Sequence, residues 1–268
     1  MKILILGCGS IGTVIARAAD EMEDIEEILL HDIDRSKIDT LMSKISRGKS
    51  LEEGDIASSG ADILIEAASQ GAAKENIPVA LESGMDAMIL SVGAFVDLSF
   101  QNRCYSALKD RDINLLIPSG SIAGIDALKA AGCASIDVVR LTTTKPPKGL
   151  RGAKYLTDEK IDVDRMKEKT VLYSGPATRA VQLFPANVNV AATVSLAGIG
   201  FDRTQVQVVC DPATDVNSHQ LYVKGSFGEM ESVTRNRPSP DNPRTSYLAS
   251  LSAVSALKSY ARKIWISV

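Results

Sequence analysis

Three glycines near the N-terminus, Gly7, Gly9 and Gly12, have a spacing that could hold a phosphate. The apolar run 3–6 precedes them as a buried strand would, and apolar residues at three-to-four spacing follow them as a helix face would. In this setting the glycines permit a tight turn, a close approach of phosphate to backbone, and close packing of the helix on the strand. The helix N-terminus adds N–H groups and a positive dipole end. The motif therefore predicts a pyrophosphate site formed by Gly7, Gly9, Ser10, Ile11 and Gly12.

Asp32 ends a second apolar run and lies twenty residues after Gly12. A dinucleotide-binding unit needs a carboxylate there to accept hydrogen bonds from the hydroxyls of the adenosine ribose. Asp32 favours NAD, but Arg35 could pair with a 2′-phosphate, so NAD or NADP stays open as the cofactor. Ligands of open α/β sheets bind beyond the carboxyl ends of the strands, where we also expect cofactor contacts from Ala67, Ala68 and Ser69.

The sequence offers two histidines as acid–base groups for hydride-transfer chemistry. His31 lies beside the expected adenosine site, far from a nicotinamide. His219 begins an alternating run in the second half, and the ordinary pKa of an imidazole suits proton transfer near neutral pH. The residues alone leave a catalytic His219 and a packed structural histidine as equal alternatives.

The first half of the chain alternates short apolar runs with amphipathic stretches, which predicts a Rossmann-type, doubly wound parallel sheet covered on both faces. Residues 50–53 have the spacing of a capping box at a short helical turn. Strands are expected at 3–6, 27–31, 62–68, 87–91 and 113–117, and helices at 36–46, 71–82 and 99–109.

The character of the sequence changes near Pro118, where longer runs with period-two alternation begin. They predict a second α+β domain with an open-faced mixed sheet. We expect residues 1–119 to form the dinucleotide-binding domain, completed by a C-terminal helix within 245–268, and residues 120–244 to form the catalytic domain. Strands are expected at 136–144, 170–174, 205–210, 218–224 and 227–233, and helices up to 131, at 176–183 and at 188–198.

Composition excludes several classes of protein. The chain has 268 residues, 45% hydrophobic content and a formal net charge of −3, as a globular protein with an ample core would. There is no basic excess to suggest nucleic acid and no apolar stretch long enough to suggest a membrane span. The four cysteines lack metal-ligand spacing, so we expect no metal and a reducing, cytoplasmic location. We expect Cys8 to fill space rather than to act as a nucleophile.

Six runs in the second half resemble the L-aspartate dehydrogenase family, and the match follows essentially the whole chain in order. The resemblance implies a Rossmann domain and a catalytic domain with a mixed sheet, often paired sheet to sheet as a homodimer. The runs are Pro-Ser-Gly-Ser-Ile-Ala-Gly at 118–124, Thr-Lys-Pro-Pro at 144–147, Ser-Gly-Pro-Ala at 174–177, Phe-Pro-Ala-Asn-Val-Asn-Val-Ala-Ala at 184–192, Asn-Ser-His at 217–219 and Asn-Pro-Arg-Thr-Ser at 242–246.

The resemblance also implies roles for individual residues. His219 matches the family's active-site acid–base residue, and Ala123 and Asn189 match its cofactor contacts. Arg244 stands where the family usually has lysine, and arginine keeps the charge but not the shape. L-Aspartate carries two carboxylates and one ammonium group, so its site should offer cations and polar donors. The candidates are Lys145, Arg244, Thr245 and Asn187, although Asn187 could instead cap a helix.

The function that the resemblance implies is NAD(P)-dependent oxidative deamination of L-aspartate to iminoaspartate, which water converts to oxaloacetate and ammonia. It also implies a link to NAD biosynthesis. Two alternatives remain: a dihydrodipicolinate reductase-like NAD(P)H-dependent reductase, and a non-catalytic NAD(H)-binding sensor. The first should carry paired histidines, which the sequence lacks. The presence of His219 and the balanced charge argue against the second.

Overall fold

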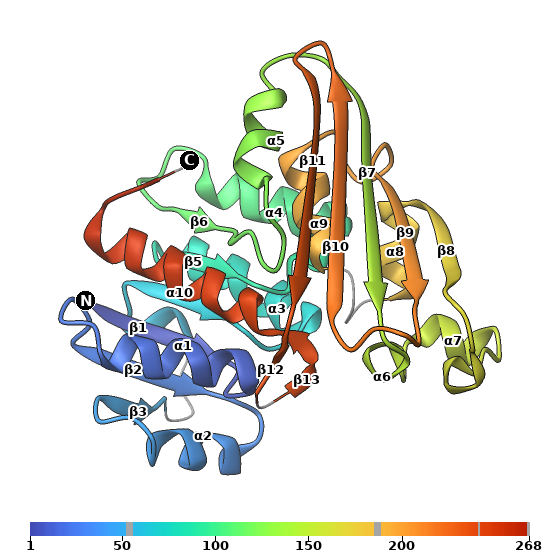
Figure 1. The fold of residues 1–268 in the computed structure, drawn as a ribbon. Coiled ribbons are helices and arrows are strands. Elements are labelled where there is room, and N and C mark those ends of the chain that lie inside the picture. The colour runs from blue at the N-terminus through green and yellow to red at the C-terminus, as the bar shows by residue number, and fades with distance from the viewer. Residues whose placement is uncertain (52–55, 185–188, 241, 267–268) are drawn as a thin grey trace. The chain divides into compact units, whose positions relative to one another are not determined.

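The computed structural model describes residues 1–51, 56–184, 189–240 and 242–266, and these form two compact units (Figure 1). The first unit consists of Met1–Pro118 together with Ser250–Ile266, and the second consists of Ser119–Ala249. Each unit contains one main β-sheet. The division gives each unit its own layers and its own buried core.

The first unit contains a six-stranded sheet in which every pair of neighbouring strands is parallel. The order is β3-β2-β1-β4-β5-β6, so the direction of strand addition reverses between β1 and β4. Leu6, the last residue of β1, pairs with His31 of β2 and Glu66 of β4, so these strands end level. The strands are β1 Lys2–Leu6, β2 Glu27–His31, β3 Gly48–Ser50, β4 Ile63–Glu66, β5 Asp86–Ile89 and β6 Leu115–Leu116.

Helices cover both faces of this sheet, with α1 and α10 on one face and α3 and α4 on the other (Figure 1). The C-terminal helix α10 contributes Ala253, Val254 and Leu257 to the core that forms around β1, β2 and β4. The predicted doubly wound parallel sheet is therefore confirmed. The helices are α1 Ser10–Asp20, α2 Arg35–Met42, α3 Gln70–Glu82, α4 Leu98–Leu108 and α10 Tyr247–Arg262, with short 3₁₀ turns η1 Ile56–Ser58 and η2 Val92–Val96.

One prediction of local structure in this unit is wrong, and another is not tested. The helix expected over 36–46 ends at Met42, where Ser43 forms the C-cap and its N–H donates to the carbonyl of Asp39. The capping box expected at 50–53 lies partly outside the described residues; Ser50 itself ends strand β3 and pairs with Leu30. Residues 52–55 lie outside the described part of the chain.

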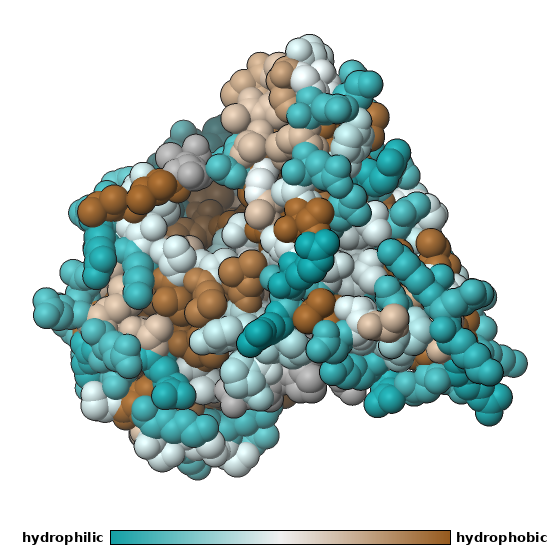
Figure 2. All heavy atoms as spheres, in the orientation of Figure 1, coloured by the Kyte–Doolittle hydropathy of each residue, from teal (hydrophilic) through white to brown (hydrophobic). Residues whose placement is uncertain are grey.

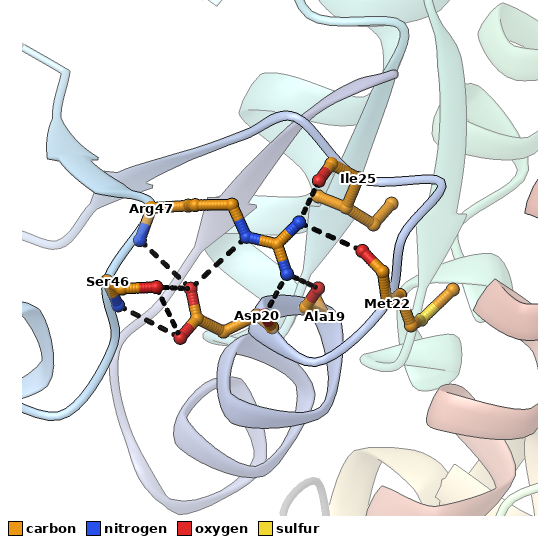
Figure 3. Close-up of polar contacts among 6 residues, drawn as sticks. All are labelled: Ala19, Asp20, Met22, Ile25, Ser46 and Arg47. Carbon is orange, nitrogen blue, oxygen red and sulfur yellow. Dashed lines mark hydrogen bonds and ion pairs between the residues drawn. The ribbon is translucent and has the colours of Figure 1, made fainter.

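Arg47 fixes the end of α1, as Figure 3 shows. Its guanidinium donates to the carbonyl oxygens of Ala19, Asp20, Met22 and Ile25. Helix C-termini leave carbonyl groups without partners inside the helix, and a cation at that end also suits the helix dipole. The Asp20 carboxylate in turn accepts the N–H of Arg47 at 2.9 Å. This cluster holds the far end of the helix whose N-terminus follows the glycines.

The second unit contains a five-stranded mixed sheet in the order β11-β10-β7-β9-β8. β7 and β9 pair in parallel, and the other neighbours are antiparallel. A small two-stranded sheet joins β12 Pro238–Ser239 to β13 Asn242–Ser246. The main strands are β7 Ile136–Lys145, β8 Thr170–Pro176, β9 Gln205–Cys210, β10 Asn217–Gly225 and β11 Gly228–Asn236.

One face of this sheet is buried and the other is exposed. Along β10, Leu221 and Val223 are fully buried, whereas the alternate residues Gln220 and Lys224 are exposed. Helix α9 also carries a run of buried side chains, from Val190 to Ser195. The predicted α+β domain with an open-faced mixed sheet is confirmed. Its helices are α5 Ile125–Ala131, α6 Pro147–Leu150, α7 Lys154–Asp158, α8 Ala177–Leu183 and α9 Asn189–Ala197, with a 3₁₀ turn η3 at Val163–Arg165.

Within the described residues, no helix has both the length and the apolar character needed to cross a membrane. The segment after α10 nevertheless exposes hydrophobic side chains, and it forms the brown strip at the upper left of Figure 2. Its exposed residues are Ile264, Trp265 and Ile266.

Candidate active site

The glycine loop has the geometry that its spacing predicts. Gly7 has φ of +101°, and a Cβ there would lie 2.7 Å from the carbonyl oxygen of Ala67. A Cβ on Gly12 would collide with the carbonyl oxygen of Gly7. A Cβ on Gly9, in contrast, would meet nothing within 4 Å. Gly7 and Gly12 are therefore required for packing, whereas Gly9 faces open space.

The N-terminus of α1 fits a phosphate. Gly9 is its N-cap and provides no side-chain hydrogen bond, and the first turn contains no acidic residue. The N–H groups of a helix start and its dipole favour an anion at such a position. Ser10 and Ile11 begin the helix directly after Gly9. The predicted pyrophosphate contacts are thus gathered on one turn of backbone.

Asp32 links the end of β2 to the glycine loop. Its Oδ2 accepts the N–H of Cys8 at 2.8 Å, and its Oδ1 accepts the N–H of Asp34 at 2.8 Å. The Lys37 ammonium lies 3.8 Å from Oδ1. Each carboxylate oxygen has a further lone pair for a ribose hydroxyl. Arg35 donates to Ser50 Oγ at 2.9 Å, so its guanidinium already has a partner within the protein.

Cys8 behaves as a packing residue. It is buried in the loop, and burial, with a smaller contribution from the charge of Asp32, raises the pKa of its thiol to about 12. A thiol with this pKa is protonated at physiological pH and is a poor nucleophile.

The loop after β4 begins with a buried carboxylate that the sequence reasoning missed. Glu66 Oε1 accepts the N–H of Ala68 at 2.9 Å and the hydroxyl of Ser91 at 2.8 Å. Oε2 accepts the N–H of Ser91 at 2.9 Å and that of Leu90 at 3.3 Å. Burial raises the pKa of this carboxyl, and the four donors oppose the shift. The sequence feature that could have indicated this residue is an acidic side chain directly after the apolar run 63–65.

The other predicted contacts of this loop have structural partners. The N–H of Ala67 donates to the carbonyl oxygen of Leu6 at 2.8 Å, continuing the ladder between β4 and β1. Ser69 caps α3, because its Oγ accepts the N–H of Ala72 at 3.2 Å. The loop therefore has a fixed backbone at the carboxyl end of the sheet.

In the second unit, polar side chains form a block on the covered face of the sheet. His219 of β10 stands opposite Thr143 of β7 and Thr234 of β11. Two residues further along the strands, Asn217 stands opposite Asn236. Burying polar side chains in an otherwise apolar layer destabilises the fold unless they are hydrogen-bonded. Clusters of buried polar and titratable side chains are typical of functional sites. The buried members are Thr143, Lys145, Asn217, His219 and Asn236.

Two hydroxyls hold the ring of His219. Its Nε2 lies 3.1 Å from Ser121 Oγ and its Nδ1 lies 3.1 Å from Thr143 Oγ1. Burial, and then the charge of Lys145, lowers its pKa to about 3. The ring is therefore neutral at physiological pH, with one nitrogen as donor and the other as acceptor. The expectation of an ordinary imidazole pKa is wrong, because the residue is buried, with an exposed fraction of 2%.

The loop that carries Ser121 and Ala123 is tied to β11. The carbonyl oxygen of Ser121 accepts Thr234 Oγ1 and Asn236 Nδ2, each at 2.9 Å. The carbonyl oxygen of Ala123 accepts Ser232 Oγ at 2.8 Å. Neither Ser121 nor Thr143 was predicted as a site residue, since the contact of Thr143 with His219 depends on strand register and that of Ser121 on the packing of this loop against the sheet.

Lys145 ends β7 within the same block. It is 5% exposed, and burial lowers the pKa of its ammonium to about 8. A Cβ on Gly149 would lie 3.6 Å from Lys145 Cβ and 3.4 Å from Asn217 Oδ1, so α6 packs closely on both side chains. Asn217 Nδ2 also donates to Ser246 Oγ at 3.3 Å, which brings β13 to this end of the sheet.

The remaining predicted residues are distributed as follows. Thr245 is half-buried and precedes Ser246 in β13, and Asn189 is the first residue of α9. Asn187 and the side chain of Arg244 lie outside the described part of the structure. Within the residues that the structure describes, no group of three or more His, Cys, Asp or Glu could hold a metal ion.

Comparisons with known proteins agree along the whole chain. Residues 126–260 match the family model "Aspartate dehydrogenase, C-terminal", and residues 7–118 match "Homoserine dehydrogenase, NAD binding domain". An L-aspartate dehydrogenase of Methanosarcina acetivorans is 46% identical over 99% of both chains. One of Nitrosopumilus maritimus is 42% identical over 97% of this chain and 96% of its own.

Solved structures extend this agreement to the fold. The crystal structure of aspartate dehydrogenase from Thermotoga maritima superposes with a TM-score of 0.76 at 29% identity, covering 100% of this chain and 98% of that one. A scyllo-inositol dehydrogenase from Lactobacillus casei, solved with NAD(H) and scyllo-inositol, has a TM-score of 0.55 at 15% identity, covering 98% and 89%. The second likeness concerns the fold alone.

Proposed function

The chain belongs to the aspartate dehydrogenase family, and from this membership we propose that it catalyses the NAD(P)-dependent oxidative deamination of L-aspartate. It is an oxidoreductase that uses NAD or NADP. The product is iminoaspartate, which water converts to oxaloacetate and ammonia. The observation that carries the proposal is the buried polar block around His219, in a chain whose other unit has a glycine loop for a dinucleotide.

The first unit would hold the cofactor. The open space at Gly9 and the N-terminus of α1 fit a pyrophosphate, and Asp32 fits the adenosine ribose. When bound, the nicotinamide supplies the acceptor for the hydride that leaves Cα of the substrate. We assign the cofactor contacts to Gly7, Gly9, Ser10, Ile11, Gly12, Asp32, Ala67, Ala68, Ser69, Ala123 and Asn189.

His219 would exchange protons with the substrate. A neutral imidazole can take a proton from the substrate amine or from the water that attacks the imine. The hydroxyls of Ser121 and Thr143, each 3.1 Å from a ring nitrogen, orient the ring, and each can donate to or accept from the nitrogen it faces. The charge of Lys145 destabilises the protonated form of the ring, which favours release of the proton after it has been accepted.

Lys145 would bind a substrate carboxylate. It is the cation of the buried block, and a charged hydrogen bond in a poorly solvated site is stronger than one at the surface. Thr245, Asn187 and Arg244 complete the proposed set. Lys148 is exposed, and Arg151 pairs with Asp164 at 2.7 Å on the surface, so neither belongs to it.

We further propose a cytoplasmic homodimer that supplies iminoaspartate to NAD biosynthesis. The four cysteines are all unpaired, which suits a reducing compartment. The open face of the second sheet offers the dimer surface, where a shallow hollow of about 330 Å³ lies among polar side chains. These are Arg140, Thr142, Gln207, Gln220, Tyr222 and Glu231.

The test is NADH or NADPH formation in alkaline buffer with L-aspartate, L-malate or L-glutamate. L-Aspartate should be the preferred substrate by a wide margin, with ammonia released in equal amount to the reduced cofactor. Cofactor binding without turnover of L-aspartate would instead favour the non-catalytic sensor. Turnover of L-malate alone would contradict the proposal that the substrate is an amino acid.

A further inference from the structure

The buried carboxylate of Glu66 joins two loops of the first unit. Glu66 is the last residue of β4 and is 0% exposed. Its four donors come from Ala68, in the loop after β4, and from Leu90 and Ser91, in the loop after β5. Oε1 accepts from both loops and Oε2 accepts from the loop after β5, so one side chain spans the carboxyl ends of two adjacent parallel strands.

The loop after β4 also presses against the glycine loop. A Cβ on Gly7 would lie 2.7 Å from the carbonyl oxygen of Ala67 and 2.9 Å from Cα of Ala68. The N–H of Ala68 is one of the groups that Glu66 holds, at 2.9 Å. A shift of this loop would therefore reach the backbone that is expected to receive the pyrophosphate.

A glutamate at the end of a core strand is energetically unfavourable unless its carboxylate has hydrogen-bond partners. Desolvation of a carboxylate costs several kcal/mol, and hydrogen bonds must offset it. An apolar residue would continue the run of Ile63, Leu64 and Ile65, which are all fully buried, without that cost. A carboxylate accepts more hydrogen bonds than any neutral side chain of similar size, which suits the joining of several backbone N–H groups.

We propose that Glu66 is a positioning residue for the cofactor, acting as a brace that holds the loops 67–69 and 90–91 in the conformation that receives the dinucleotide. It does not touch the cofactor, because it is completely buried. The inference rests on the proposed cofactor site of the first unit. Its consequence is that weakening the brace lowers cofactor affinity more than it lowers the stability of the unit.

The main variant is Glu66→Gln, which keeps the shape but turns one acceptor into a donor, so that in either orientation of the amide its NH2 group faces at least one backbone N–H donor. NAD affinity should fall about ten- to hundredfold, which corresponds to the free energy that hydrogen bonds to a charged group contribute. The matched control is Leu81→Ala. Leu81 is fully buried near the C-terminal end of α3, away from the loop that begins this helix. The control should lower the melting temperature while leaving NAD affinity close to wild type.

Ser91→Ala and Glu66→Asp make the test independent of the main variant. Ser91→Ala removes one of the four donors and should weaken NAD binding severalfold, and Glu66→Asp should weaken it more, because the shorter side chain cannot reach both loops. Dissociation constants for NAD and melting temperatures are measured for all four variants.

If the Glu66 variants lose stability but keep wild-type NAD affinity, the proposal that Glu66 positions the cofactor loops is wrong. If Glu66→Gln does not fold, wild-type affinity in both Ser91→Ala and Glu66→Asp would overturn it equally. Failure of the wild-type protein to bind NAD or NADP would instead contradict the proposed function, so the two failures are distinguishable.

Discussion

In the first unit, the groups that face the proposed cofactor site are mainly backbone N–H groups and glycines at the carboxyl ends of parallel strands. In the second unit, the centre of the proposed site is formed by side chains on three adjacent strands, β7, β10 and β11. The first arrangement follows from a contiguous motif of a few residues. The second depends on which residues stand opposite one another in a sheet.

The two regions also differ in charge. The glycine loop leaves open space at Gly9, and this N-cap of α1 makes no side-chain hydrogen bond, which suits an anion. The block around His219 buries one ammonium group, Lys145, beside a neutral imidazole. The first region is therefore suited to binding a charged ligand, whereas the second is suited to moving a proton under the influence of a fixed cation.

The largest expected effect separates two glycines of the first unit. Gly9→Val should abolish detectable NAD binding while the protein stays folded, because its side chain would occupy only the open space at the loop. Gly12→Val should destabilise the unit itself, because a Cβ there collides with the Gly7 carbonyl. Circular dichroism and NAD titration distinguish the two outcomes. A folded Gly9→Val protein with normal NAD binding would refute the phosphate clamp.

The next effect tests the second region. His219→Ala should lower kcat about 100-fold or more with little change in NAD affinity, as loss of an acid–base group does. His31→Ala is the control and should keep its turnover. Because burial lowers the pKa of His219 to about 3, the wild-type kcat should show no histidine step between pH 5 and pH 7. A step in that range that disappears in His219→Ala would show that the ring titrates in the working enzyme.

The contrast between the regions explains how much the sequence could predict. The glycine loop and Asp32 were found because their chemistry lies within a single strand–turn–helix unit with a known spacing. Apart from the short β3, the strands of the two main sheets were found from apolar runs and period-two alternation, and most of their limits lie within a few residues of the prediction.

The missed residues are those defined by partners far away in sequence. Thr143 meets His219 across 76 positions and Ser121 meets it across 98. Strand register sets the contact of Thr143, and a slip of one residue would turn every side chain to the other face. The contact of Ser121 depends on how the loop before α5 packs on the sheet. Glu66 was missed for a related reason. Its role depends on hydrogen bonds from Ser91, which lies one helix and one strand later in the chain. The low pKa of His219 likewise follows from burial, which the sequence does not state.

A smaller effect is expected at Lys145. Its ammonium loses its charge as pH rises through about 8, so a carboxylate ligand should bind more weakly above that pH. Succinate tests this without the titrating amine of aspartate. Its inhibition constant should rise above about pH 8 in the wild type and stay flat in Lys145→Arg, which keeps its charge. Lys145→Met should lose about 2–4 kcal/mol of succinate binding below pH 8, as removal of one partner of a buried charge pair does. A wild-type constant that does not change with pH would contradict this role.

The smallest effect concerns the choice of cofactor at Asp32. Its carboxylate already accepts two backbone N–H groups at 2.8 Å, and each oxygen can accept a ribose hydroxyl in addition. Asp32→Ala should therefore weaken NAD binding by about 1–3 kcal/mol. NADP binding should suffer less, because the substitution also removes a negative charge that repels the 2′-phosphate. Asp32→Asn is the matched control, since it keeps the shape and removes the charge, and it should improve NADP relative to NAD. Fluorescence titration of both cofactors measures the difference, and equal losses for NAD and NADP would show that Asp32 supports the loop without contacting the ribose.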